Sequence, residues 1–90
     1  MATYKDLLEL IAKREFGIIG EKNTRTIYAS IGLALDDDVT LEESDVNYGN
    51  LEKLMGVLKE KYGMVAIIGC KIPAIRMAKQ SGLELPDVLR

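Results

Sequence analysis

The chain of 90 residues contains no histidine, no tryptophan and only one cysteine. Without histidine, the usual catalytic triad and any zinc site with imidazole ligands are excluded. The single cysteine, Cys70, excludes an internal disulfide and a thiolate cluster, and it favours a reducing, cytoplasmic location. We therefore expect a cytoplasmic protein that holds no metal and no cofactor, with Cys70 packed as a small buried side chain.

Long apolar runs are absent as well. The longest one, residues 64–70, is much shorter than the ~20 residues of a membrane-spanning helix. The amino-terminal apolar pattern is interrupted by Lys5, Asp6 and Glu9, which excludes the apolar centre of a signal peptide. With 48% hydrophobic and 29% charged residues, the composition is that of a globular protein, and we expect residues 1–90 to form one domain without membrane contact.

Four glycines close stretches whose apolar residues recur at helical spacing, and each is followed at once by a large apolar residue. A glycine just past a helix adopts the left-handed conformation without steric cost, and the apolar residue after it folds back onto the last turn. The four are Gly17, Gly32, Gly63 and Gly82. The pattern predicts a mostly α-helical fold, a compact bundle of about four short helices joined by tight corners.

Three of these helices are expected over residues 4–16, 21–31 and 51–62. The third has the clearest pattern, with apolar residues at i, i+3, i+4, i+7 and i+11 and charged residues on the opposite side. Asn47 or Asn50 is expected to cap its start, because a side-chain oxygen there satisfies free backbone N–H groups. After the last glycine, residues 83–86 are expected to pack across the bundle as a tail.

The segment of residues 64–81 fits two different structures. One is a single helix kinked at Pro73, with an apolar face on one side and a more polar face on the other. The alternative is a buried strand over residues 64–68, which makes the fold α+β and places Pro73 at the start of a final helix. The kinked helix is favoured because the polar face keeps its helical period through the proline. The apolar face consists of Met64, Val65, Ile68, Ile72 and Ile75, and the polar face of Gly69, Pro73, Arg76 and Gln80.

An acidic connector lies between two mildly basic parts of the chain. Residues 36–45 carry a charge of −6 and contain no base, whereas the parts before and after them carry +1 and +3. The connector does not match a calcium-binding loop, because counting from Asp36 places Leu41 where the invariant glycine belongs. We expect a solvated loop, with a short β pairing within residues 33–41.

The apolar side chains exceed what a single core of this size readily covers. The excess is densest in residues 64–68, and an exposed apolar surface on a small protein is by default an interface. We therefore expect a non-enzymatic protein-interaction module that binds a protein partner or itself, with a homodimer favoured and the third and fourth helices supplying the contact. The expected interface residues are Met64, Val65, Ile68 and Ile72.

A basic face near the carboxyl-terminal end supports a different function. Lys71, Arg76 and Lys79 recur along the last predicted helix, and no acidic residue occurs from position 61 to position 83. Such a face can contact phosphate groups or an acidic partner. The first alternative is therefore a transcriptional regulator that binds nucleic acid through Lys71, Arg76 and Lys79.

A small enzyme or ligand-binding subunit is the second alternative. Its reactive group would come from Cys70, Lys71 or Tyr28, because a thiol, an amine and a phenol can each act as a nucleophile or transfer a proton. No set of residues with catalytic spacing emerges from the chain, so the sequence predicts no catalytic residue.

Overall fold

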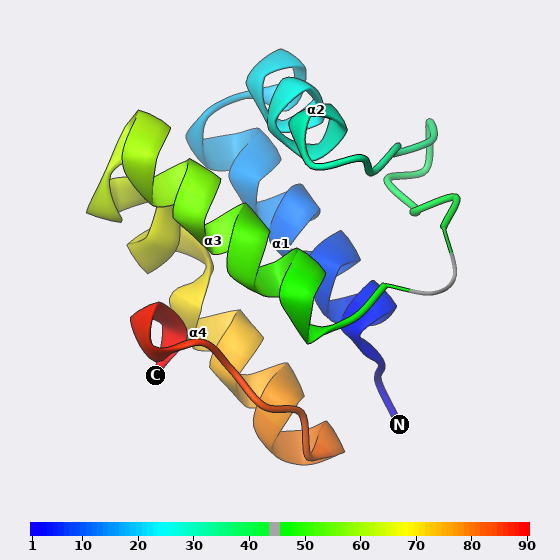
Figure 1. Cartoon of the computed structure of the whole chain (residues 1–90), viewed down its shortest axis with the longest axis vertical. Coiled ribbons are helices and arrows are strands. Elements are labelled where there is room, and N and C mark those ends of the chain that lie inside the picture. The colour runs from blue at the N-terminus through cyan, green and yellow to red at the C-terminus, as the bar shows by residue number, and fades with distance from the viewer. Residues whose placement is uncertain (44–45) are drawn as a thin grey trace.

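The computed structural model describes residues 1–43 and 46–90, and helices account for most of them (Figure 1). The elements are α1 (Tyr4–Ile18), α2 (Glu21–Ser30), α3 (Tyr48–Tyr62), α4 (Met64–Ser81) and the short 3-10 helix η1 (Asp87–Leu89). Among the described residues there is no sheet, and Leu35 and Leu41 form one isolated antiparallel bridge. The predicted mostly α-helical bundle is confirmed, and so is the brief β pairing within residues 33–41.

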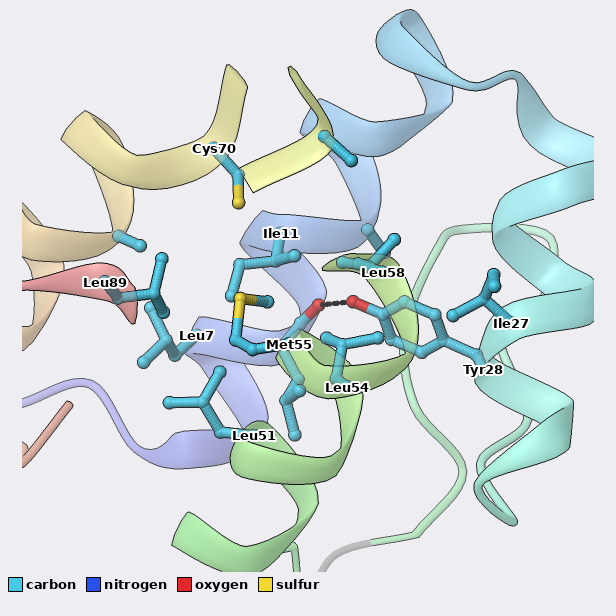
Figure 2. Close-up of a cluster of buried hydrophobic side chains, with 14 of the residues drawn as sticks. Leu7, Ile11, Ile27, Tyr28, Leu51, Leu54, Met55, Leu58, Cys70 and Leu89 are labelled. Atoms are coloured by element: carbon cyan, nitrogen blue, oxygen red, sulfur yellow. Dashed lines mark hydrogen bonds between the residues drawn. The ribbon is translucent and has the colours of Figure 1, made fainter. Parts of the chain in front are cut away.

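The core lies where α1, α3 and α4 meet, and α2 closes one side of it (Figures 1 and 2). The predicted stripe of the third helix is confirmed, because four of its five apolar residues are buried and the fifth, Tyr62, is half-buried. The Tyr28 hydroxyl of α2 donates a hydrogen bond of 2.6 Å to the Leu8 carbonyl of α1, which satisfies this buried polar group (Figure 2). The fully buried side chains around it include Leu7, Leu8, Ile11, Leu51, Leu54 and Leu58.

Side chains and glycines define the helix ends. Asn47 caps α3, and it exchanges hydrogen bonds with Asn50, so both residues proposed for the cap take part in it. Gly32 and Gly82 end α2 and α4 with positive φ angles of 82° and 68°. The N–H of the residue after each glycine donates to the carbonyl five positions back, at 3.0 Å and 2.9 Å, which is the expected fold-back arrangement.

Two of the four predicted glycine stops differ from expectation. Gly17 does not end α1, which continues to Ile18, and the turn into α2 is made instead by Gly20. The extension has a physical reason, because the Ile18 side chain fills the space that a side chain on Gly69 of α4 would occupy. Gly63 ends α3, but the residue after it begins α4 directly and does not fold back.

Residues 64–81 form one helix, so the alternative of a strand over residues 64–68 is wrong. Pro73 lies within this helix and has no N–H to donate to the carbonyl of Gly69. The Arg14 side chain of α1 donates to that carbonyl instead, with an Nε to O distance of 3.3 Å. A side chain of the neighbouring helix thus replaces the missing helical hydrogen bond and allows α4 to continue through the proline.

The described part of the acidic connector, residues 36–43, is held by hydrogen bonds to backbone groups. The Asp36 carboxylate accepts from the N–H groups of Asp38 and Thr40, both at 2.9 Å. The Arg25 guanidinium donates to the carbonyls of Leu35 and Asp36 at 2.6 Å and 3.1 Å. The connector's last acidic residue, Asp45, lies outside the described residues.

The carboxyl-terminal segment returns along α4 and covers part of the core (Figure 1). Leu89 of η1 is fully buried, and Pro86 is buried ahead of it. The expectation that the tail packs across the bundle is therefore confirmed, although the segment ends in a short helix whose leucine completes the core. Among the residues described, no helix has both the length and the apolar character needed to span a membrane.

Candidate interaction face on helix α4

The outward face of α4 exposes large aliphatic side chains. Val65, Ile68 and Ile72 are 66%, 63% and 62% exposed, and Met64 at the start of the helix is 43% exposed. Because residues three or four positions apart lie on the same side of a helix, these side chains form a continuous line. We call this line the α4 stripe; it consists of Met64, Val65, Ile68 and Ile72. The four residues that the sequence nominated for an interface thus share one exposed face.

The inward face of α4 consists mostly of small residues. Ala66, Cys70, Ala74 and Ala78 are buried there, and Ile67 is the one large aliphatic residue on this side. A helix of a monomeric globular protein ordinarily has the opposite arrangement, with its larger apolar side chains inside. Small side chains let α4 approach α1 closely, but they leave the isoleucines in water. The free energy gained by removing the outward face from water is therefore still available through contact with a partner.

Cationic side chains accompany the α4 stripe. Arg76 and Lys79 are exposed and lie four and seven positions after Ile72, so they share its face, whereas Lys71 is half-buried at the edge. Within the described residues, none of the three cations forms an ion pair. The prediction that Arg76 lies on the face opposite the stripe is wrong, because Arg76 follows Ile72 by about one helical turn and both side chains are exposed on the outward face.

The α4 stripe leads into a surface hollow of about 380 Å³ between the last turns of α4 and the returning chain end. We call it the C-terminal hollow; its lining consists of Ile75, Ala78, Lys79, Leu83, Glu84, Leu85 and Arg90. Ile75 lies three positions after Ile72 and connects the stripe to the hollow. The Arg90 guanidinium at the rim is 3.2 Å from the Asp87 carboxylate, and its Nε donates to the Leu85 carbonyl at 2.9 Å.

An unpaired carboxyl group lies inside the molecule, at the contact between α1 and α4. Glu15 is fully buried, and neither of its carboxyl oxygens has a hydrogen-bond partner among the residues that the structure describes. Burial raises the pKa of Glu15 to about 7, and the neighbouring Cys70 thiol opposes this only in part. Glu15 is not among the residues predicted from the sequence, although it follows Ile11 by four positions and so belongs to the inward face of α1.

The residues proposed for an enzymatic role do not meet in a cleft. Cys70 is fully buried, its thiol donates to the Ile67 carbonyl at 3.4 Å, and burial together with Glu15 raises its pKa to about 12. The expectation of a buried Cys70 is confirmed. The Tyr28 hydroxyl is also inside the core, where burial raises its pKa well above the usual value. Neither Cys70, Tyr28 nor Lys71 lines the C-terminal hollow.

In the described ranges, 1–43 and 46–90, no three potential metal-ligating side chains come together. Comparison of the chain with protein-family models, with curated proteins and with solved structures found no match. Function therefore has to be inferred from the outward face of α4 and the hollow at its end.

Proposed function

We propose that the protein is a non-enzymatic interaction module, that the α4 stripe is its binding surface, and that its partner is a second copy of the chain. The observation that supports this is the inverted helix: α4 buries alanines and exposes Val65, Ile68 and Ile72 by more than three fifths. Exposed aliphatic residues that lie in one line on a single helix are typical of a protein interface. A cytoplasmic location is part of the proposal, because the lone cysteine is unpaired.

The expected affinity follows from the exposed side chains. Complete burial of one large aliphatic side chain contributes about 1.5–3 kcal/mol, and the stripe offers four partly exposed ones on each copy. Association of two chains costs about 4–15 kcal/mol. The burial gain of the two stripes is therefore of the same order as this cost, and we expect a weak dimer that dissociates on dilution.

Sedimentation velocity over a concentration series tests the proposal. Wild-type protein should change from monomer to dimer as its concentration rises, whereas Ile68→Glu should stay monomeric, because pairing would bury two carboxylates without partners. Ala29→Glu is the matched control, since Ala29 is exposed on α2 and the same charge is added there. Circular dichroism shows whether both variants remain helical. A wild-type chain that is monomeric throughout would contradict the homodimer.

Nucleic-acid binding is the second candidate function. The specific observation in its favour is that Arg76 and Lys79 are exposed and that α4 contains no acidic residue. Phosphate contacts by these cations predict binding of a DNA duplex that weakens steeply as salt is added. The adjoining isoleucines favour the protein interface, since aliphatic side chains gain little against a phosphate backbone. Fluorescence anisotropy with a labelled duplex measures this, and no binding at low salt would remove the candidate.

A further inference from the structure

We infer that two copies pair with their α4 helices antiparallel, so that Met64 and Val65 of each copy lie against the C-terminal hollow of the other. This pairing rests on the proposed function, because it specifies how the second copy sits on the α4 stripe. The two ends of the stripe differ: exposed side chains stand at its start, and an apolar recess beyond Ile72 ends it. A twofold axis through the middle of the stripe places the exposed start of the stripe in each copy against the recess of the other copy.

The spacing of the aliphatic residues suits this symmetry. Val65, Ile68, Ile72 and Ile75 follow one another at intervals of three, four and three positions, so the order is the same in both directions. With a rise of about 1.5 Å per residue, Val65 and Ile75 each lie about 8 Å from the midpoint between Ile68 and Ile72. In an antiparallel pair, Ile68 therefore faces the second copy's Ile72, and Val65 faces its Ile75. Alternating steps of three and four are those of a helix–helix seam.

The area required by a stable dimer supports the participation of the hollow. Each large aliphatic side chain offers on the order of 100 Å² of apolar surface, so the stripe alone supplies a few hundred Å² per copy. Specific interfaces bury about 800 Å² on each partner. The apolar lining of the hollow, which includes Leu83 and Leu85, adds to this contact, which remains in the size range of weak, reversible association. Met64 suits the recess because an unbranched thioether adapts to an irregular space.

The charges around the stripe make the salt dependence informative. Antiparallel pairing about position 70 brings Lys71 close to the second copy's Lys71, and Arg76 and Lys79 of both copies flank the seam, so cations outnumber the acidic Glu84 of the hollow. Repulsion between these cations weakens the dimer at low ionic strength, and added salt screens it. We therefore expect the dimer to tighten by about two- to fivefold between low and high salt. An acidic protein partner or a nucleic acid would show the opposite dependence.

Disulfide cross-linking between two single variants tests the orientation. Met64→Cys and Leu83→Cys are prepared separately, mixed at a concentration where wild type is dimeric, and oxidised with copper phenanthroline. The mixture should give a cross-linked dimer containing one chain of each variant, and Met64→Cys alone should give little product. The native Cys70 is inaccessible and does not contribute. Ala29→Cys, on the exposed surface of α2, is the control for random collisions.

Each result has a distinct meaning. Efficient self-linking of Met64→Cys would show parallel pairing, which overturns the inferred orientation but leaves the homodimer intact. Cross-linking of the mixture at no more than the Ala29→Cys level, with the variants still dimeric by sedimentation, would also overturn it. Monomeric wild type, by contrast, contradicts the proposed function itself. Tightening of the dimer by salt supports the pairing, and weakening by salt counts against it.

Discussion

The two α-helices in the carboxyl-terminal half of the chain, α3 and α4, pack against the core in opposite ways. In α3 the large residues Leu51, Leu54 and Leu58 are buried and the charged residues are outside. In α4 alanines and a cysteine are buried, and Ile68 and Ile72 are in solvent. Both helices pack in the same bundle, so hydrophobicity alone does not decide which side chains are buried. Close approach between backbones competes with it, and at α4 close approach prevails.

The largest expected effect is on the free energy of unfolding. Truncating one leucine of α3 and one isoleucine of α4 to alanine tests the contrast between the two helices directly. Leu54→Ala in α3 should reduce the free energy of unfolding by about 2–5 kcal/mol, because it leaves a cavity in the core. Ile72→Ala in α4 should change it by less than about 0.5 kcal/mol in dilute, monomeric protein, because Ile72 is already exposed. Urea denaturation measures both. Equal losses at the two positions would show that α4 buries the face we describe as outward.

The second expected effect concerns Glu15, the polar group at the contact between α1 and α4. Its pKa is raised from 4.5 to about 7, so the native state keeps the proton to a higher pH than the unfolded state. The carboxylate is therefore disfavoured in the native state, and the free energy of unfolding should fall by about 3 kcal/mol as the pH rises from 4.5 through 7.

A Glu15→Gln variant isolates that contribution, because it cannot ionise and all other titrating groups are retained. The difference in the free energy of unfolding between wild type and Glu15→Gln should change with pH between 4.5 and 7 and become constant above that range. Cys70, with a pKa of about 12, does not titrate in this window. A difference that is independent of pH would show that Glu15 has the same pKa in the native and unfolded states, and hence that its surroundings are more polar than described.

The smallest expected effect concerns Gly69, whose missing side chain leaves a notch in α4 that the Ile18 side chain of α1 fills. A methyl group added by Gly69→Ala would meet the Ile18 side chain, whereas helix propensity favours alanine over glycine by about 1 kcal/mol. We expect Gly69→Ala to stabilise the protein in an Ile18→Ala background by that amount, and to give no gain in wild type. The coupling of about 1 kcal/mol is measured by a double-mutant cycle in urea. Additive effects would mean that Ile18 does not occupy the notch.

Local features of the chain predicted much of the fold. The cap at Asn47, the fold-back at Gly32 and Gly82, and the buried stripe of α3 all depend on residues within one or two helical turns. The bridge between Leu35 and Leu41 likewise joins neighbours in the chain. Such features follow from backbone conformation and hydrogen bonding over short distances, which the order of residues specifies directly.

Features that depend on distant contacts were predicted less well. The local pattern predicts a helix end at Gly17, but the fit of Ile18 against Gly69 carries α1 past it. The burial of Leu89 depends on the chain end returning to α4, which no local pattern indicates. The buried Glu15 occupies a core-facing position of α1, although glutamate side chains are mostly exposed in folded proteins.

The candidate site was predicted in part. The four residues of the α4 stripe were nominated as an interface from their surplus apolar character, and they are exposed together. Their role in binding stays a prediction, as does that of Lys71, Arg76 and Lys79. The C-terminal hollow was not predicted, because it forms between α4 and a segment that approaches it only in the folded chain.

By itself, the sequence determined where the helices of this protein lie and how most of them end, since these features depend on short-range geometry. It also determined that α4 would have more large aliphatic side chains than a small core needs. Only the tertiary structure decided which face of α4 is turned inward. The reason is steric: with alanines inside, the Gly69 notch accepts Ile18 and Arg14 reaches the free carbonyl, and the isoleucines are left on the surface.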